Sequence, residues 1–446
     1  MKLNIIVSNM ALLKSIDPFL MGKLRKELTV EEHVASSVLE RSPFLSPPQH
    51  KLYRISGNDS LQVPVGFLYY LGHKFGVDFD FDDQRFESAD LLDIEFGGKL
   101  RSYQEKAVDA LYKRTVGLIQ SPVGSGKTAM LIALICKRKQ PTLFICNRKS
   151  LCLQFLDEVR KFTNYTDLGL ICDNKCEVRN ISAATFQTLN NFFPKQFEEL
   201  NHKYGQVLVD EVHTIAATTY YQVLNSLKAK YKYGVSATIY RDDGLEKIIS
   251  YTGGPIAHEI TLDDVKDFIL IPIYKTVKTN YFFPIIDTIR DYGPLVEALV
   301  TDRERNDLIK STWEDYSERN CLFLCSRVNH VEILNSLIPG SVALTGKTPQ
   351  KTRIEIFQKV RDQEIKALIT TDSLFKLGMN FPVLDVLFLC SPSRSRSGMV
   401  QAAGRIMRKK DGKAQPIIVD FVDHKVGLLY SQSVSRKRSL RGMVFC

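Results

Sequence analysis

Short apolar runs of strand length alternate with helical patterns along most of this 446-residue chain. Such alternation is typical of βαβ units, in which parallel strands form a sheet that helices cover on both faces. One series of runs precedes a polar stretch near 252–262, and a second series follows it. The first comprises TVGLIQ, TLFIC, LGLIC, QVLVD and YKYGVS, and the second CLFLCS, SVALT, IKALIT, VLFLCS and PIIVDF. The pattern predicts two tandem α/β domains built on parallel sheets.

The N-terminal region has a different composition. It combines a helical segment, the proline-rich RSPFLSPPQH and two strand-like runs, KLYRIS and VDFDF, before FGGK at 96–99 indicates a hinge. We therefore expect a small α+β domain over 1–95, a first α/β domain over 96–255 and a second over 256–446.

The charge is distributed unevenly. The chain carries a net charge of +10, yet residues 1–98 hold 10 basic and 14 acidic residues, so the positive excess lies in the remainder. A basic body suits a polyanionic partner, because neutralising phosphates releases counterions, although solvated basic faces are also common. No apolar stretch reaches the ~18 residues of a membrane span. The N-terminus lacks the basic region and cleavage site of a signal peptide.

Nine cysteines, an odd number, are spread through apparent strands and helices, which favours a reducing compartment over a disulfide framework. Two pairs are spaced by four residues, Cys172/Cys176 and Cys321/Cys325. In CLFLC that spacing places Cys321 and Cys325 on one face of a strand. Buried thiols are favoured over a zinc site, because no Cys/His pattern of the usual spacing surrounds them.

The strongest local signal is the segment QSPVGSGKT at 120–128, which lies between a strand-like and a helix-like run. Glycines let backbone N–H groups surround phosphate oxygens at the start of the following helix. Lys127 is predicted to reach the β- and γ-phosphates of a nucleotide, and Thr128 to hold Mg²⁺. A chance glycine-rich turn is disfavoured by both flanks and by the intact Gly-Lys-Thr, although Ser121 replaces a glycine of the strict pattern. The predicted nucleotide-binding residues of the loop are Ser121, Pro122, Val123, Gly124, Ser125, Gly126, Lys127 and Thr128.

Two adjacent carboxylates follow the run QVLVD in the sequence DEVH. Asp210 is predicted to bind Mg²⁺, and Glu211 to orient and deprotonate the attacking water. Alone, such a pair would usually be a solvated turn. Downstream of a phosphate loop it becomes a specific signal.

Together these motifs resemble helicase superfamily two, whose remaining motifs follow in order over roughly 100–420. LRSYQEK at 100–106 is similar to the adenine-reading segment and implies that Gln104 contacts the base. Segments 144–155 and 182–189 resemble two motifs that contact the nucleic-acid backbone. The resemblance implies that Arg148 in the first segment and Thr185 in the second make these contacts. The resemblance also implies residues that couple ATP state to domain closure, namely His213, Ser236 and Thr238.

In the second domain, 321–334 and 369–382 resemble motifs IV and V, which implies further nucleic-acid contacts at Ser326, Arg327, Thr370 and Thr371. Segment 401–408 matches motif VI. There Gln401, Arg405 and Arg408 are the implied catalytic residues, with both arginines reaching the γ-phosphate as arginine fingers. Without the other motifs, the simpler interpretation would be that these arginines lie on a solvent-exposed face of a helix. The sequence departs from the family pattern in DEVH itself, at Ile239 directly after Ser236–Thr238 (motif III), and at Leu377 and Asn380 in motif V. These positions bear on ribose contact and on coupling between the domains.

The sequence that follows Thr238 indicates which group of the superfamily the chain resembles most. Arg241 begins Arg-Asp-Asp, which resembles the Arg-Glu-Asp element of XPB-type helicases, and Arg241 is an implied nucleic-acid contact. The segment at 51–71 resembles the one ahead of the motor in XPB, the poxviral transcript-release helicase and phage UvsW. With its small N-terminal domain and no evident nuclease, the chain looks most like the UvsW-type branch-migration helicases.

The resemblance implies two RecA-like domains that use ATP and Mg²⁺ to move on DNA, chiefly through phosphate contacts. The expected function is remodelling of branched DNA (branch migration, fork regression or unwinding) in replication, recombination or repair. A monomer in the cytoplasm of a bacterial or phage-infected cell is expected. The N-terminal domain is expected to engage the duplex or branch point, or only to pack against the motor.

Other functions remain open. An RNA helicase or transcript-release ATPase would share every catalytic residue, since the chemistry resides in ATP. A non-enzymatic clamp is opposed by the intact Lys127, Glu211, Arg405 and Arg408. A restriction motor subunit would require a nuclease partner. The basic tail from Arg436 to Arg441 could contact DNA or be a solvated end.

Overall fold

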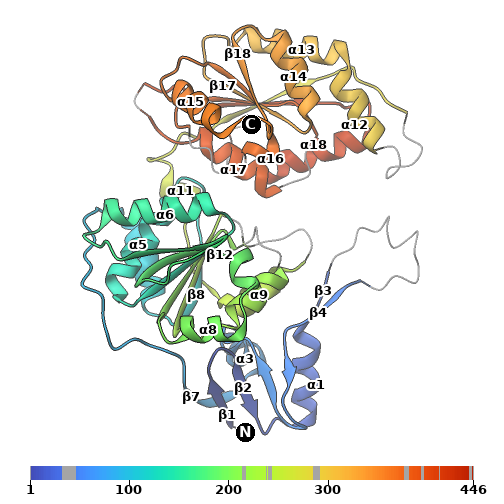
Figure 1. The fold of residues 1–446 in the computed structure, drawn as a ribbon. Helices are drawn as coiled ribbons and strands as arrows, with labels where there is room; N and C mark the ends of the chain where they lie inside the picture. Colours follow the sequence, from blue (N-terminus) through green and yellow to red (C-terminus); the bar gives the residue numbers. More distant parts are fainter. Residues whose placement is uncertain are drawn as a thin grey trace. The chain divides into compact units, whose positions relative to one another are not determined.

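A computed structural model gives the fold (Figure 1). It describes residues 2–32, 47–212, 217–237, 239, 244–284, 292–375, 381–392, 396–410, 412–440 and 444. The chain divides into two compact units, one of residues 1–122 with 126–261 and the other of residues 123–125 with 262–446. The two units are described separately below.

The N-terminal part of the first unit is a small α+β structure. Its described strands form one sheet in the order β5-β6-β2-β1-β7, in which β1 pairs antiparallel with β2 and parallel with β7. Alternate residues of β1 are buried and pack with Phe67 and Leu71 of α3. The elements are β1 (Lys2–Val7), β2 (Ala11–Lys14), α1 (Pro18–Glu27), β5 (Arg54–Ile55), β6 (Leu61–Val63), α3 (Phe67–Phe75), β7 (Asp78–Asp83) and a separate pair, β3 (Thr29–Glu31) with β4 (Gln49–Lys51).

An eight-stranded sheet forms the body of the first unit, in the order β11-β10-β12-β9-β13-β14-β8-β15. Every pairing is parallel except that of the edge strand β11. The strands are β8 (Val116–Gln120), β9 (Thr142–Cys146), β10 (Leu168–Cys172), β11 (Lys175–Cys176), β12 (Ile181–Thr185), β13 (Gln206–Asp210), β14 (Tyr231–Ser236) and β15 (Ile256–Glu259). All five strands predicted from apolar runs in this region are confirmed.

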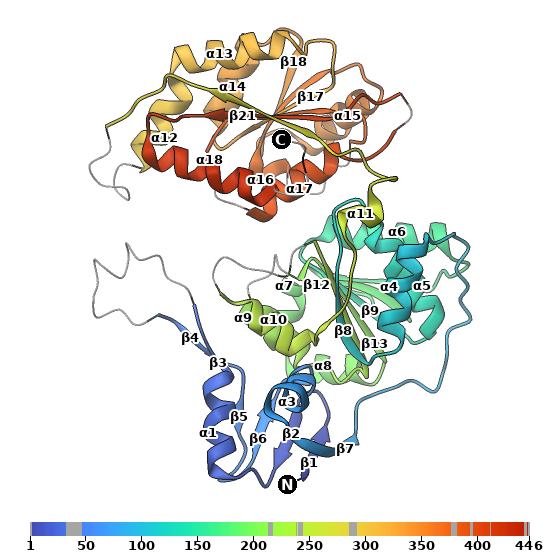
Figure 2. The same ribbon diagram turned by 180° about the vertical axis from the view of Figure 1, so that it is seen from behind.

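Helices cover both faces of this sheet (Figure 2). On one face lie α4 (Ser102–Tyr112), α5 (Lys127–Arg138) and α6 (Lys149–Phe162), and on the other α7 (Phe186–Asn190), α9 (Ala217–Leu224) and α10 (Glu246–Gly253). A further helix, α8 (Pro194–Asn201), precedes β13. The central strands are apolar throughout because both of their faces are buried.

The second unit contains six described strands, all parallel, in the order β16-β21-β20-β17-β19-β18. They are β16 (Ile273–Lys278), β17 (Cys321–Cys325), β18 (Ser341–Leu344), β19 (Ala367–Thr371), β20 (Val386–Leu389) and β21 (Ile417–Val422). The helices are α11 (Leu262–Val265), α12 (Tyr292–Thr301), α13 (Arg303–Glu314), α14 (Val328–Leu337), α15 (Gln350–Arg361), α16 (Asp372–Phe375), α17 (Arg396–Ile406) and α18 (Gly427–Leu440). The five strands predicted here are confirmed.

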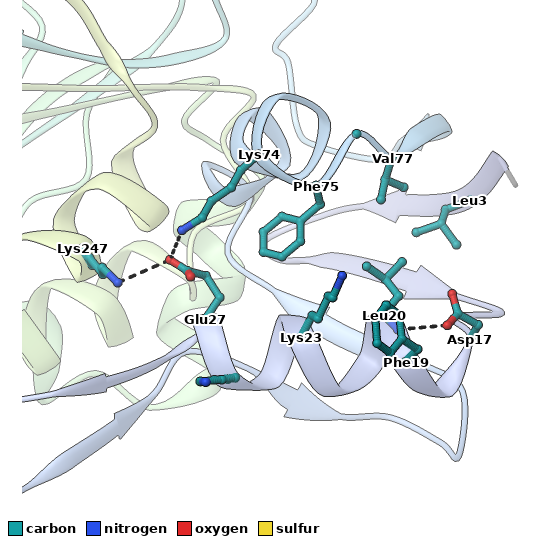
Figure 3. A pocket seen from close by; sticks show the side chains of 12 residues that line it. Leu3, Asp17, Phe19, Leu20, Lys23, Glu27, Lys74, Phe75, Val77 and Lys247 are labelled. Atoms are coloured by element: carbon teal, nitrogen blue, oxygen red, sulfur yellow. Dashed lines mark hydrogen bonds and ion pairs between the residues drawn. The ribbon is translucent and has the colours of Figure 1, made fainter.

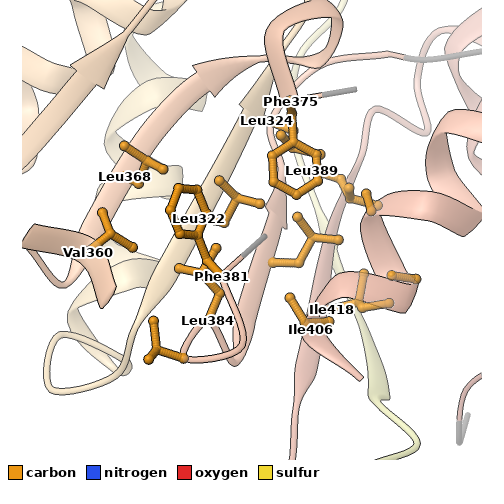
Figure 4. Packing of buried hydrophobic residues seen from close by; sticks show 14 of the residues in the cluster. Leu322, Leu324, Val360, Leu368, Phe375, Phe381, Leu384, Leu389, Ile406 and Ile418 are labelled. Atoms are coloured by element: carbon orange, nitrogen blue, oxygen red, sulfur yellow. The ribbon is translucent and has the colours of Figure 1, made fainter. Parts of the chain in front are cut away.

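Successive residues of the central strands enter opposite cores. Leu322 and Leu324 of β17 pack with Leu368 and Phe381 on one face (Figure 4). Cys321, Phe323 and Cys325 face the other core, beneath α13 and α14. The prediction that Cys321 and Cys325 share one buried strand face is therefore confirmed.

Within the described part of the chain, no helix is long and apolar enough to cross a membrane. The structure also contains strands that the apolar pattern does not predict. β15 lies inside the polar stretch near 252–262, and as an edge strand it has no fully buried residue, so it need not be apolar. β12 reads ISAAT, and its small residues gave no apolar run although all five are buried.

Candidate active site

The predicted site residues of the first unit gather at one edge of the eight-stranded sheet, where its parallel strands end. The phosphate loop leaves β8, Asp210 ends β13, and Ser236 ends β14. Thr185 ends β12, beside β9, and Arg148 follows β9. Loops at the carboxyl ends of parallel strands are the usual position of ligand sites in such sheets. The chain order of strands and helices therefore brings together residues that are far apart in sequence.

The loop between β8 and α5 depends on glycine. Gly124 and Gly126 have φ angles of +87° and +82°, which side chains rarely adopt. A Cβ added to Gly126 would lie 2.4 Å from Nε2 of Gln104, so this side chain, buried on α4, packs directly against the loop. The backbone N–H of Arg101 donates to Oε1 of Gln104 over 2.9 Å, which holds the amide in place.

The loop is also tied to the motif at the end of β14. The backbone N–H of Ser121 donates to the carbonyl of Ser236 over 2.9 Å, and both residues are buried. Ser125 is buried as well, while Pro122 and Val123 are half-buried. A serine at position 121 is therefore accommodated without disturbing the connection between the loop and β14.

Lysine and carboxylates meet at the start of α5. Lys127 Nζ lies 3.3 Å from Glu211 Oε1, and both side chains are largely buried. Asp210 Oδ1 is buried and has no hydrogen-bond partner among the described residues. Burial and the neighbouring Glu211 charge raise the pKa of Asp210 to about 7, although Lys127 opposes the shift. Glu211 has a φ of +50°, an uncommon value for a residue with a side chain.

These groups suit a magnesium–nucleotide. Mg²⁺ prefers carboxylate and hydroxyl oxygens together with phosphate oxygens. The orphaned oxygen of Asp210 supplies a carboxylate, and Thr128, half-buried in the first turn of α5, supplies a hydroxyl. The N-terminus of α5 and Lys127 offer the positive charge that phosphates require.

Two predicted nucleic-acid contacts lie at the same sheet edge. Arg148 is the residue before α6, and its Nη1 atom is buried without a hydrogen-bond partner among the described residues. Burial lowers the pKa of the Arg148 guanidinium. Thr185 caps α7, and its Oγ1 lies 2.9 Å from the hydroxyl of Thr188. Arg148 is thus a cation without a protein partner in the described chain.

The second unit places its predicted contacts in the same way. Ser326 and Arg327 follow β17 and are exposed, and Thr370 and Thr371 end the adjacent strand β19. All four therefore lie at the carboxyl edge of the six-stranded sheet. Thr370 is buried, and its hydroxyl has no hydrogen-bond partner within the described residues.

The motif VI residues lie on and after α17. Arg405 donates a hydrogen bond to the carbonyl of Phe375, and its guanidinium lies 4.4 Å from the centre of the Phe375 ring. Arg408 is half-buried beside Ile269, with which it forms an isolated β-bridge. Gln401 lies on α17, but the structure does not describe its side chain. The predicted site residues His213, Thr238 and Arg241 lie outside the described residues.

Sequence reasoning missed one charged cluster. Glu27 of α1 accepts hydrogen bonds from Lys74 of α3 and Lys247 of α10 (Figure 3). It accepts a further hydrogen bond from the hydroxyl of Tyr251, also on α10. These residues are separated by up to 224 positions, so no local pattern connects them. The only signal in the sequence was the basic last turn of α1, which contains Arg25 and Lys26.

Comparisons with known families agree with this geometry. The family described as "Type III restriction enzyme, res subunit" matches residues 97–241, which include the phosphate loop and both carboxylates. The family described as "Helicase conserved C-terminal domain" matches residues 304–410, which include motifs IV to VI. Together the two matches span more than half of the chain.

Relatives extend over most of the chain. A putative ATP-dependent RNA helicase of Acanthamoeba polyphaga mimivirus is 25% identical over 94% of this chain and 81% of its own length. A DNA 3'-5' translocase of the XPB type from Sulfurisphaera tokodaii is 24% identical over 73% of this chain and 81% of its own length. The crystal structure of UvsW from bacteriophage T4 aligns over 100% of this chain and 98% of its own, at 15% identity and a TM-score of 0.44.

Proposed function

Because this chain belongs to the ATP-hydrolysing helicases of superfamily two and has relatives of the XPB type, we propose that it remodels branched DNA. The proposed activities are branch migration, fork regression and unwinding during replication, recombination or repair. The expected boundary after residue 255 is moved to residue 261, because β15 (Ile256–Glu259) pairs with β8 of the first sheet. Residues 96–261 and 262–446 would form the two motor domains, and residues 1–95 would engage the branch point.

The observation that carries this proposal is the packing of the N-terminal part against α10 of the first motor domain. Leu245, Ile248 and Tyr251 of the α10 region belong to the same buried cluster as the N-terminal sheet. A Cβ on Gly66 would lie 2.4 Å from the backbone nitrogen of Gly254, so the two backbones are in direct contact. The rings of Phe67 and Tyr251 lie 5.0 Å apart. A motor that works at a junction needs a part that holds a second DNA arm at a fixed position.

We assign the chemistry to the residues at the sheet edge. Lys127 would bind the β- and γ-phosphates, and Glu211 would accept a proton from the attacking water. Thr128 and Asp210 would hold Mg²⁺, which neutralises charge on the phosphates. Arg405 and Arg408 would stabilise the charge of the transition state, and Gln104 would read adenine.

Nucleic-acid binding would follow the carboxyl edges of both sheets. Arg148, Thr185 and Arg241 would contact backbone phosphates in the first motor domain. Ser326, Arg327, Thr370 and Thr371 would do so in the second. Such contacts carry no sequence information and weaken steeply as salt rises.

The test is steady-state ATP hydrolysis with no polymer, single-stranded DNA, duplex DNA, a four-way junction and RNA. Stimulation by the junction above that of linear duplex, absent in Lys127→Ala, would support the proposal. Stimulation by linear duplex equal to that by the junction would contradict it. Strand-exchange assays on a mobile junction would then measure branch migration directly.

RNA is the second candidate substrate. It is favoured by the mimiviral relative, whose name describes an ATP-dependent RNA helicase. The catalytic residues do not discriminate, because they act on ATP. Stimulation by RNA alone would move the assignment to an RNA helicase or a transcript-release ATPase.

A further inference from the structure

We propose that a hollow on the N-terminal part binds one nucleotide of single-stranded nucleic acid, with its phosphate on Lys23 and Lys26 and its base on Phe19. This inference rests on the proposed function, since it requires nucleic acid to be the partner. It adds a strand-binding site distinct from the sheet edges of the motor.

The hollow lies between α1, the end of α3 and α10 (Figure 3). Its volume is about 770 Å³, within the ~300–1,000 Å³ typical of ligand clefts. Phe19, Lys23 and Lys26 recur at helical spacing, so they follow one face of α1 along the hollow. Lys74 and Lys247 line it from α3 and α10.

Its charge favours an anion. Four ammonium groups line the hollow, against the carboxylates of Asp17 and Glu27. Asp17 is committed to the first turn of α1, where it accepts the backbone N–H of Leu20 over 2.9 Å. Glu27 is committed to Lys74, at 2.8 Å, and to Lys247, at 3.4 Å.

Two of the lysines are left without an anionic partner. Among the described residues, neither Lys23 nor Lys26 forms an ion pair. Other lysines of the same part are paired, as Lys2 is with Asp80 at 2.8 Å. Lys23 and Lys26 are exposed and lie one turn apart, which suits two oxygens of one backbone phosphate.

The aromatic ring decides between single and double strands. Phe19 is 73% exposed, so its ring is accessible to a ligand at the edge of the hollow. Lys23 Nζ lies 4.1 Å from the centre of its ring. Proteins that bind single strands combine cations that track the backbone with rings on which bases stack. In a duplex the base faces are already stacked, so a stacking ring selects an unpaired base.

Glu27 connects this hollow to the motor. Burial pulls the pKa of Glu27 upward, but hydrogen bonds from Lys74 and Tyr251 outweigh burial and hold the pKa below its usual value. The carboxylate therefore stays charged and joins α1 and α3 to α10. A nucleic-acid strand in the hollow would lie against Lys247 of α10, and α10 belongs to the first motor domain.

The experiment uses the full chain and two labelled probes, an oligodeoxythymidine and a blunt duplex of equal length, with binding measured by fluorescence anisotropy. Phe19→Ala should weaken oligodeoxythymidine binding about tenfold, because one stacked base is lost. Lys23→Gln with Lys26→Gln should flatten the slope of log Kd against log salt by about 0.7, because one phosphate contact is lost. Phe19→Trp offers a larger ring, so it should bind more tightly.

Matched controls lie outside the hollow on the same part of the chain. Phe81→Ala removes another exposed ring, and Lys14→Gln with Lys51→Gln removes two exposed charges. Both controls should bind as the wild type does. Circular dichroism melts would establish that every variant is folded.

The outcomes separate this inference from the proposed function. If the wild type binds oligodeoxythymidine but the hollow variants match their controls, the hollow is not the site and the proposed function stands. Equal losses for the duplex would overturn the assignment to single strands. A wild type that binds neither probe and shows no polymer-stimulated ATP hydrolysis would overturn both.

Discussion

Lys127 Nζ lies 3.3 Å from Glu211 Oε1, so the cation proposed for the phosphates and the carboxylate proposed to activate water form an ion pair. Both side chains are largely buried, so each compensates the charge of the other where water is scarce. Phosphate oxygens would replace Glu211 as the partner of Lys127 when a nucleotide binds. Glu211 would then be released to act as the base, which links nucleotide binding to activation of the carboxylate.

Lys127→Ala should lower the rate of ATP hydrolysis by at least about a hundredfold, the usual loss when one preorganised charge-stabilising group is removed. Binding of nucleic acid without nucleotide should persist, because Lys127 belongs to the phosphate loop. The control is Lys137→Ala on the same helix, where an exposed lysine pairs with Asp109. Steady-state ATP hydrolysis and anisotropy measure the two properties. Hydrolysis by Lys127→Ala at the wild-type rate would refute the assigned role.

If Asp210 holds Mg²⁺ as proposed, magnesium binding should be sensitive to pH near neutrality. Its pKa of about 7 means that Mg²⁺ must displace a proton as the pH falls below this value. The apparent affinity for Mg²⁺ in the presence of ADP should therefore fall up to about tenfold per pH unit below 7 and level off above it. Asp210→Asn should bind Mg²⁺ weakly, and its affinity should lack the part of the pH dependence that comes from Asp210.

Calorimetric titrations at pH 6, 7 and 8 would measure both proteins. Protonation of the nucleotide is common to the two, so the difference between them reports Asp210. Parallel pH profiles for wild type and Asp210→Asn would show that Asp210 does not titrate in this range.

Much of the fold could be predicted because its signals are local. A buried parallel strand must be apolar on both faces, so ten strands appeared as continuous runs such as QVLVD and CLFLC. The phosphate loop is likewise a single segment, and its glycines adopt the positive φ angles that the motif requires. Where a strand is built from small residues, as β12 is, or lies at an edge, as β15 does, the apolar signal is absent.

The remaining features depend on contacts between distant segments. The sequence could suggest an adenine-reading role for Gln104, but not that its amide would pack against Gly126. Nor could it connect Glu27 with Lys247, which lie 220 residues apart and meet because α10 packs on the N-terminal sheet. Such contacts follow from the three-dimensional packing of whole elements, which a single sequence does not reveal.

Gly126→Ala should damage nucleotide binding more than it damages folding. The φ of +82° costs alanine about 1–2 kcal/mol, and the new Cβ would lie 2.4 Å from Gln104 Nε2. The matched control is Gly340→Ala, where φ is +70° but nothing lies within 4 Å of the added atom. Both variants should melt at similarly reduced temperatures, and only Gly126→Ala should also bind ADP more than about tenfold more weakly. Equal ADP affinities of the two variants would show that the Gln104 side chain can move away from the added Cβ without weakening nucleotide binding.

The last prediction concerns Lys232, which is buried on β14. Its Nζ donates to the carbonyls of Leu224 and Leu227 over 2.9 and 2.6 Å. A neutral amine has two N–H groups for these two acceptors, and burial lowers the pKa of Lys232 from 10.5 to about 7. Between these values the unfolded chain binds a proton that the folded chain does not. Folding stability should therefore rise with pH from about 7 to 10.5, and fall as pH decreases toward 7.

Lys232→Met cannot titrate, so it should lack this component. Relative to Lys232→Met, the wild type should gain up to about 1.4 kcal/mol of unfolding free energy per pH unit in that range. The two unpaired carbonyls left by the substitution cost stability at every pH and do not affect the slope. Urea denaturation at pH 7, 8 and 9 would measure this, with Lys228→Met as a control because Lys228 is exposed. If the wild type and Lys232→Met showed equal pH slopes, Lys232 would have to be charged in the folded chain, held by its two carbonyls as an ammonium.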